Sequence, residues 1–287
     1  MKSNKAKKRN LTDGLYIVAT PIGNLDDISS RAIKVLQEVD FIVCENPKHS
    51  QKLLNKKGIK KELISLHDYN EEKIINKISK IKNNSKIALI SDAGSPLISD
   101  PGYKFVKYFL DNNIYVTTVP GGSSVISALQ LSGLPINNFV FYGFVPKQES
   151  KKKRFFTKIK NVGLTSVFFV SAKNLIETIN NIIEFIGEQE ISVCKEITKL
   201  NELVLRTKTN KILQLLKEQK VLLKGEFTIV VAGEIRKKPK IINNVIKNEL
   251  IKLLKKYNLT EAVKIVHSLT GISKKEVYQV ALKLKDD

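Results

Sequence analysis

Four short loops of this 287-residue chain combine glycine, proline, serine and acidic residues directly after apolar segments. They are ATPIGNL (19–25), CENPKHS (44–50), SDAGSPLISDPG (91–102) and VPGGSSV (119–125). Glycine lets a backbone approach a ligand closely, and small residues such as Ala93 and Ser95 leave room beside it. These loops could therefore hold a small molecule against the main chain.

Apolar, strand-like segments precede the loops, and helical patterns separate them. The predicted strands are 15–20, 41–44, 86–90, 114–119 and 139–145, and the predicted helices are 29–39, 50–56, 71–82, 103–110 and 123–131. Such alternation indicates a mostly parallel α/β sheet. Ligands of these sheets bind beyond the carboxyl ends of the strands, so we expect the loops to gather there.

A second, smaller α/β series follows a charged connector at 148–160. Its predicted strands are 165–170, 191–195 and 227–231, and its predicted helices are 174–186 and 210–218. A linker at 237–240 leads to a helical tail, in which Ser273 and Glu276 have the spacing of a capping box and indicate a helix-turn-helix. The predicted organisation is a basic extension (1–13), an N-terminal α/β domain (14–146), a second α/β domain (147–236) and the tail (237–287).

Composition excludes several classes of protein. The chain has neither G-x-G-x-x-G nor G-x-x-x-x-G-K-[ST], which disfavours dinucleotide dehydrogenases and P-loop NTPases. No apolar run approaches the ~20 residues of a membrane helix, and no apolar run follows the basic N-terminus as in a secretory signal. Cys44, Cys194 and three histidines lack ligand spacing, so we expect no metal site and a reducing, cytoplasmic setting.

Positive charge is concentrated at the two ends of the chain. The formal net charge is +21, of which residues 1–10 carry +5 and residues 236–287 carry +8. Charge gathered in appendages is a plausible electrostatic footprint for nucleic acid, although a solvated lysine-rich surface gives the same totals.

Taken together and in this order, the motifs resemble a known family. The sequence is similar to the tetrapyrrole-methylase superfamily and, within it, to the bacterial 16S ribosomal RNA cytidine 2′-O-methyltransferases. The matching stretches are LYIVATPIGNLDDISSRAIKVL, SDAGSPLISDPGY, VPGGSSVISALQLSGLP, FYGFVP, KEITKLNE, KGEFTIVVAG and LTGISKKEVYQVALKLK.

The resemblance implies a two-domain α/β methyltransferase that binds S-adenosylmethionine (AdoMet) between its domains. It also implies a homodimer that acts on 16S rRNA in the small ribosomal subunit. The cofactor-binding residues carried over are Pro21, Gly23, Asn24, Ser91, Asp92, Ala93, Gly94, Pro96, Pro120, Gly121, Ser123, Phe169, Val170, Ser171 and Glu226.

Two motifs depart from the family pattern. The family usually reads E-D-T-R-x-S where this chain has residues 45–50, so an ammonium, Lys48, stands in for a forked guanidinium. It usually reads Y-E-S-P-H-R where this chain has residues 169–174, so Val170 replaces an acid and Asn174 an arginine. Either lysine side chains bind the nucleotide in place of the usual residues, or the activity of the protein is reduced.

Methyl transfer to a ribose 2′-oxygen needs in-line positioning of the reactants and removal of a proton. The candidates for this chemistry are Lys199, Glu196 and Glu45, with Asp92 and Asp100 as further proton acceptors. Lys48, Lys274 and Lys275 are the candidate RNA contacts.

Two alternatives remain open from the sequence. One is a methyltransferase that acts on a tetrapyrrole carbon, although a small acidic macrocycle gives no reason for a basic tail. The other is a ribosome- or RNA-binding relative whose catalysis is weakened.

Overall fold

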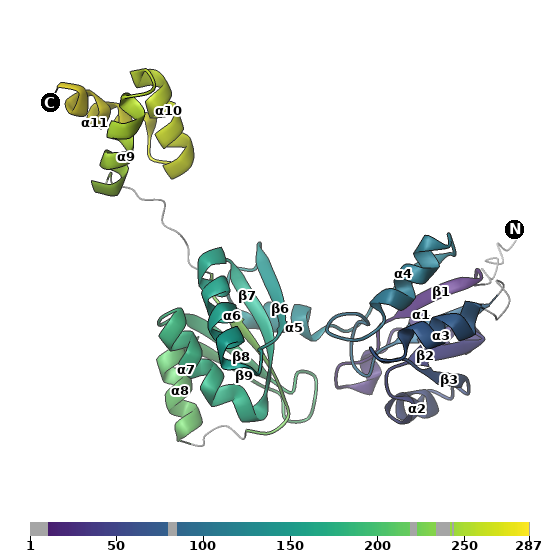
Figure 1. The fold of residues 1–287 in the computed structure, drawn as a ribbon. Helices are drawn as coiled ribbons and strands as arrows, with labels where there is room; N and C mark the ends of the chain where they lie inside the picture. The colour runs from purple at the N-terminus through teal and green to yellow at the C-terminus, as the bar shows by residue number, and fades with distance from the viewer. Residues whose placement is uncertain (1–10, 80–84, 219–222, 234–241, 243, 287) are drawn as a thin grey trace, which may run out of the picture. The chain divides into compact units, whose positions relative to one another are not determined.

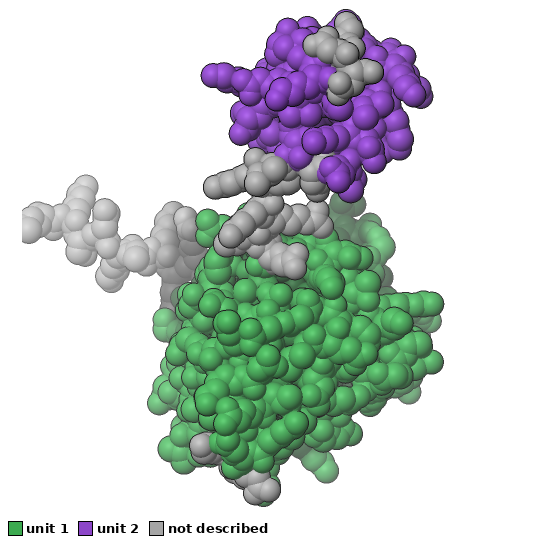
Figure 2. Space-filling model, turned by 90° about the vertical axis from the view of Figure 1, so that its left-hand side faces the viewer, with its two compact units in different colours: residues 1–233 green, residues 234–287 purple. Residues whose placement is uncertain are grey.

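The computed structural model describes all residues except 1–10, 80–84, 219–222, 234–241, 243 and 287. The chain divides into two compact units, residues 1–233 and residues 234–287 (Figure 2). The expected linker at 237–240 and nearly all of the basic extension at 1–13 lie outside the described residues. No helix among the described residues is long and apolar enough to span a membrane.

The first half of unit 1 is a five-stranded parallel sheet with the order β3-β2-β4-β1-β5. Figure 1 labels three of its strands, β1, β2 and β3. Its strands are β1 (Gly14–Val18), β2 (Phe41–Cys44), β3 (Glu62–Ser65), β4 (Lys86–Ile90) and β5 (Val116–Val119). The apolar runs predicted at 15–20, 41–44, 86–90 and 114–119 coincide with four of these strands. The strand at 62–65 was not predicted, because only two of its four residues, Leu63 and Ile64, are apolar.

Helices cover both faces of this sheet, as a buried parallel sheet requires. One face packs against α1 (Ser30–Glu38) and α2 (Pro47–Lys56), with the short η1 (Leu25–Asp27) before them. The other face packs against α3 (Glu71–Ser79) and α4 (Tyr103–Asp111). All four helices fall where the sequence predicts them.

The second half of unit 1 is a mixed sheet with the order β6-β7-β10-β8-β9. Its strands are β6 (Phe139–Phe144), β7 (Thr165–Ser171), β8 (Glu190–Lys195), β9 (Leu203–Lys208) and β10 (Glu226–Val231). β6 and β7 are parallel, and the other neighbours are antiparallel. The strand predicted at 139–145 was expected in the first series, but it forms β6 of this second sheet. The sequence did not predict β9, whose residues are at most half-buried at the edge of the sheet.

Helix α5 (Ser124–Ser132) follows β5 of the first sheet but packs on the second. Its Val125, Ala128 and Leu129 share a buried cluster with Val167 of β7 and Cys194 of β8. The opposite face of the second sheet is covered by α6 (Glu149–Val162), α7 (Leu175–Phe185) and α8 (Thr209–Lys217), and the turn η2 (Ala172–Asn174) precedes α7. The loop before α5 is thereby held beside the second sheet.

Helix α6 corrects the prediction of a connector at 148–160. Phe156 and Ile159 are buried against the second sheet, and Phe155 packs beside them. Their spacing is that of one helix face, and it was hidden in the sequence by the lysines around it.

Unit 2 contains three helices among its described residues: α9 (Asn244–Leu254), α10 (Leu259–Thr270) and α11 (Lys274–Asp286). Leu250, Val263, Val266 and Val277 lie in its small core. The predicted capping box is confirmed, since Ser273 Oγ lies 2.7 Å from a carboxylate oxygen of Glu276 and accepts the Glu276 backbone N–H at 3.2 Å.

Candidate functional site

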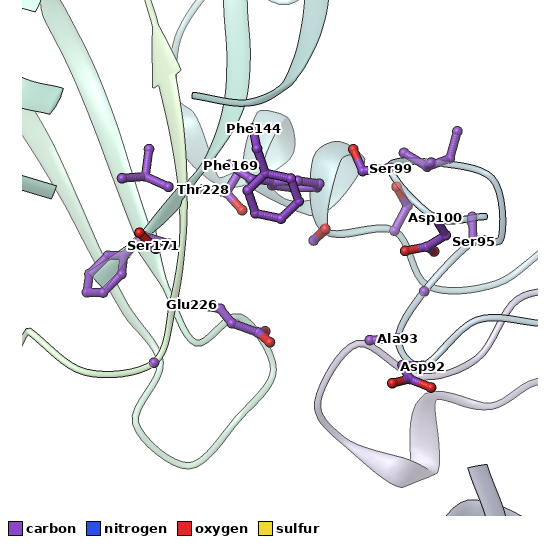
Figure 3. A pocket seen from close by; sticks show the side chains of 17 residues that line it. Asp92, Ala93, Ser95, Ser99, Asp100, Phe144, Phe169, Ser171, Glu226 and Thr228 are labelled. Atoms are coloured by element: carbon purple, nitrogen blue, oxygen red, sulfur yellow. The ribbon is translucent and has the colours of Figure 1, made fainter. Parts of the chain in front are cut away.

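A cavity of about 410 Å³ lies in unit 1 between the loop that follows β4 and the ends of strands of the second sheet. Its volume is in the range of small-molecule sites, roughly 300–1,000 Å³. Figure 3 shows Asp92, Ser95 and Asp100 on one wall, and Phe169 and Glu226 on the other. Eight residues from the expected cofactor set line it: Asp92, Ala93, Gly94, Ser123, Phe169, Val170, Ser171 and Glu226.

Hydrogen bonds fix the loop at 91–102 against its neighbours. Thr20 and Gly94 exchange backbone hydrogen bonds at 2.8 and 3.2 Å, and the Ser95 hydroxyl donates to the Gly122 carbonyl at 3.1 Å. Gly94 has a φ of +83°, and a Cβ there would lie 3.1 Å from the Ile22 side chain. The loops 19–25, 91–102 and 119–125 therefore meet at this wall, and the loop 44–50 joins them through a hydrogen bond from the Asn46 N–H to Asp92, as expected from the carboxyl ends of parallel strands.

The same loop holds two non-glycine residues in a left-handed conformation. Leu97 has a φ of +73° and Ser99 a φ of +72°. Such conformations cost of order 1–3 kcal/mol each, and they persist where the surrounding structure imposes them. The packing around this loop therefore imposes an unusual backbone conformation on the cavity wall.

Aromatic rings form the wall from the second sheet. Phe144 at the end of β6 and Phe169 of β7 have ring centroids 5.1 Å apart, and Phe144 is 61% exposed. Val170 is buried and lines the cavity where the family usually carries an acid. This wall offers an apolar surface suited to a flat ring. Ser171, at the edge of this surface, adds a hydroxyl group.

Carboxylates gather at the wall from the first sheet. Burial raises the pKa of Asp100 to about 6, and the neighbouring Glu45 and Asp92 carboxylates add to this shift. Burial and the Asp92 carboxylate also raise the pKa of Glu45. Glu45 does not line the main cavity, but it shares a small adjoining pocket with Ser91, Pro96 and Asp100.

Lys199 and Glu196 lie outside the main cavity but are connected to its rim. The Lys199 ammonium donates to Glu196 Oε1 at 3.0 Å and to Glu226 Oε2 at 2.9 Å. Partial burial disfavours the charged form of Lys199 and lowers its pKa. The two hydrogen bonds outweigh this effect, so the pKa of Lys199 is raised overall. Lys199 is therefore a protonated group that fixes the position of Glu226, a residue of the cavity wall.

The first loop contacts the segment around Lys199 instead of the cavity. The Asn24 backbone N–H donates to the Thr198 hydroxyl at 3.0 Å, and a Cβ on Gly23 would lie 2.5 Å from the Lys199 side chain. Pro21 is buried beside them, while Pro120 and Gly121 are exposed residues of the loop before α5. None of these residues lines the main cavity.

The altered motif at 45–50 begins helix α2. The Asn46 side chain accepts the His49 N–H at 3.3 Å as an N-cap, and Pro47 occupies the first turn. The Asn46 N–H in turn donates to the Asp92 carboxylate at 3.3 Å. Lys48 is exposed on the first turn, and Lys274 and Lys275 are exposed at the start of α11 in unit 2.

The cavity also contains residues that the cofactor set omitted. They are Ser95, Ile98, Ser99, Asp100, Ser124, Phe144, Gly225, Phe227 and Thr228. Most of them belong to the motifs quoted from the sequence, so the signal was present, but the direction of each side chain was not.

Comparisons with known proteins agree with this architecture. Residues 14–213 match the model of the Tetrapyrrole (Corrin/Porphyrin) Methylases. Over 283 residues the chain is 41% identical to "Ribosomal RNA small subunit methyltransferase I" of Rickettsia prowazekii (strain Madrid E), covering 96% of this chain and 98% of that protein. A protein with the same name from Thermotoga maritima is 41% identical over 221 residues, covering 77% of this chain and 98% of that protein.

Solved structures share the fold at low sequence identity. A cobalt precorrin-4 methyltransferase has a TM-score of 0.56 and 17% identity, covering 76% of this chain and 94% of that chain. A diphthine synthase has a TM-score of 0.58 and 12% identity, covering 76% and 89%. The chain belongs to the tetrapyrrole methylase family and is a methyltransferase.

Proposed function

We propose that this protein transfers a methyl group from AdoMet to the ribose 2′-oxygen of a cytidine in 16S rRNA of the small ribosomal subunit. The observation that carries the proposal is the 41% identity, over almost the whole chain, to a relative named as a small-subunit rRNA methyltransferase. Methylation of a tetrapyrrole carbon is the alternative. It draws on solved structures of at most 17% identity, which support the fold alone.

The residues of the main cavity fit AdoMet. The cofactor carries a positive sulfonium and an ammonium group, and three carboxylates, Asp92, Asp100 and Glu226, line the cavity. Phe144 and Phe169 offer an apolar wall to the adenine, and the close packing around Gly94 gives the methionine part a narrow backbone surface. AdoMet supplies the activated methyl group, and the protein supplies orientation and proton removal.

Asp100 is the carboxylate best suited to accept the ribose proton. A general base works most efficiently when its pKa lies near the working pH, and the pKa of Asp100 is raised to about 6. Lys199 is held protonated, which suits it to fixing Glu226 and stabilising negative charge rather than to accepting a proton. Glu45 and Glu196 lie outside the main cavity. The Glu45 carboxylate helps to raise the pKa of Asp100, and Glu196 accepts a hydrogen bond from Lys199.

We further propose that the protein works in the cytoplasm as a homodimer. Exposed apolar side chains at the starts of the paired strands β6 and β7, namely Ile136, Phe139 and Leu164, support a contact between copies. Sedimentation at micromolar concentration is expected to give twice the chain mass of 32.4 kDa, and a single-chain mass would contradict the dimer.

Calorimetric titration with AdoMet, followed by a methyl-transfer assay on small subunits from a strain without the enzyme, tests the proposal. We expect binding and incorporation of label into RNA. Binding of AdoMet without incorporation would indicate a tetrapyrrole substrate or another acceptor. If AdoMet does not bind, the remaining interpretation is that the protein is an RNA-binding relative that has lost catalysis.

A further inference from the structure

Helix α6 presents a stripe of cations on its outward face. Lys151, Arg154 and Lys158 follow one another at intervals of three and four residues, and Lys147 precedes them by four residues. This spacing places Lys151, Arg154 and Lys158 on one side of α6, and Lys147 lies just before the N-cap residue, Gln148. All four are exposed, and Lys153 and Lys160 flank the stripe.

The opposite face of α6 is anchored in the second sheet. Phe156 and Ile159 are buried in its core, and the buried Lys152 forms ion pairs with Glu149 and Glu177. The stripe therefore stands on a fixed helix rather than on a loose segment.

The ion pairs of the described residues do not include the cations of the stripe. Among the residues that the structure describes, no carboxylate forms an ion pair with Lys147, Lys151, Arg154 or Lys158. The Lys158 ammonium lies 5.7 Å from the centre of the Tyr142 ring, a contact that leaves its charge in place.

Helices α3 and α4 use their lysines differently. Their exposed lysines include Lys77, which pairs with Glu62, Lys104, which pairs with Glu72, and Lys107, which pairs with Asp111. Like charges three and four residues apart destabilise a helix. An unpaired row of them on α6 points to an anionic partner that neutralises it.

The stripe begins close to the cavity. Phe144, which lines the cavity, is the last residue of β6, and the Val145 N–H donates to the Phe169 carbonyl at 3.2 Å. Only a few residues separate this point from Lys147, and α6 then continues for 14 residues, which is about 21 Å. A ligand that enters the cavity with one part could lie along α6 with the rest.

The chemistry of this face matches a phosphodiester backbone. Hydroxyl groups of Ser150 and Thr157 lie among the cations and can donate hydrogen bonds to phosphate oxygens. The described outward face offers little apolar surface for insertion into a lipid bilayer, because the phenylalanines and Ile159 of α6 point into the core and only Val162, at its end, is exposed.

The Thermotoga relative gives independent support. Its match covers 98% of that protein but only 77% of this chain, and the 221 matched residues are close in number to the 233 of unit 1. A protein named as an rRNA methyltransferase thus exists without a counterpart to about a quarter of this chain. An RNA-binding surface within a body the size of unit 1 would serve both proteins.

We propose that the outward face of α6 binds the phosphate backbone of the RNA strand whose target nucleotide enters the cavity. This proposal rests on the proposed function, because it takes RNA as the substrate. It assigns to unit 1 an RNA contact that is separate from the basic tail.

The test replaces Lys147, Lys151, Arg154 and Lys158 together by glutamine. A matched control replaces Lys73, Lys77, Lys104 and Lys107, four exposed lysines of α3 and α4, by glutamine and changes the net charge equally. Both variants and the parent are titrated with small subunits that lack the modification, over 50–200 mM salt, and their AdoMet affinities and melting temperatures are measured alongside.

We expect the α6 variant to bind small subunits about tenfold or more weakly, with the slope of log affinity against log salt reduced by about 3, since each lost contact to a single strand lowers it by about 0.7. Its AdoMet affinity should match that of the parent, and its melting temperature should be equal to or slightly above that of the parent, because the like-charge pairs on α6 are removed. The control should keep most of the RNA affinity. Equal losses in both variants, or none in the α6 variant, would overturn the proposal. If the parent itself neither binds nor methylates small subunits, the proposed function fails instead.

Discussion

Replacing Asp100 by asparagine should stabilise the protein at neutral pH. Burial raises the pKa of Asp100 from 3.8 to about 6, so its ionised form is disfavoured in the folded state. At about 1.4 kcal/mol per pH unit, this difference corresponds to at most ~3 kcal/mol. Because the carboxyl is only partly buried, solvent screening reduces the figure, and we expect a gain of about 1–2 kcal/mol at pH 7.5.

The gain must depend on pH with a definite sign. The folded parent binds this proton more tightly than the unfolded chain does, so the parent becomes more stable relative to the variant as the pH falls from about 7 to about 4. Asparagine is neutral throughout, and the difference between the two proteins should vanish below a pH of about 4.

Urea denaturation of both proteins without cofactor, at intervals from pH 4 to pH 8, measures this difference. Glu184→Gln, which removes an exposed carboxyl on α7, serves as the control. A variant that is less stable than the parent at pH 7.5, or a gain that does not change with pH, would show that the folded state does not disfavour the ionised form of Asp100.

Three further predictions concern the cofactor and the RNA. Gly94→Val should lower AdoMet affinity by at least about tenfold in a protein that still folds, because a branched side chain is strained at a φ of +83° and meets Ile22; unchanged affinity by calorimetry would contradict this. Removing residues 237–287 should leave AdoMet binding intact but weaken RNA binding and its salt dependence; equal affinity and slope would make the tail a structural element. Lys48→Ala should slow single-turnover methylation at saturating AdoMet by about tenfold, whereas Lys48→Arg should keep or raise the rate. An alanine variant as fast as the parent would show that the Lys48 side chain is not needed for methylation.

Much of the first sheet could be predicted from the sequence, because its strands are buried on both faces and stand out as apolar runs. The strands at 62–65 and 203–208 carry a weaker signal, since only Leu63 and Ile64 are apolar in the first and the apolar residues of the second end at Leu205. Helix α6 was hidden for a different reason. Its exposed residues are nearly all basic, and only Phe155, Phe156 and Ile159 mark the buried face.

The candidate site was predictable in its parts but not in its assembly. The loop at 91–102 has a composition that points to a ligand, and the structure places it in the cavity wall. The pairing of Phe144 with Phe169 depends on the register of β6 and β7, and the contact of Gly23 with Lys199 depends on how two distant loops pack. No local pattern encodes these long-range contacts, so Pro21, Gly23 and Asn24 were expected at the cofactor but lie outside the main cavity.

The most direct test of the central claim is to locate the methyl group. Small subunits from a strain that lacks this protein are incubated with the enzyme and AdoMet labelled in its methyl group, and the RNA is then digested and analysed by mass spectrometry. We expect one labelled nucleotide in 16S rRNA, a cytidine that carries the methyl group on its ribose 2′-oxygen. Label on a base, or unlabelled RNA together with label on a tetrapyrrole offered in the same reaction, would contradict it.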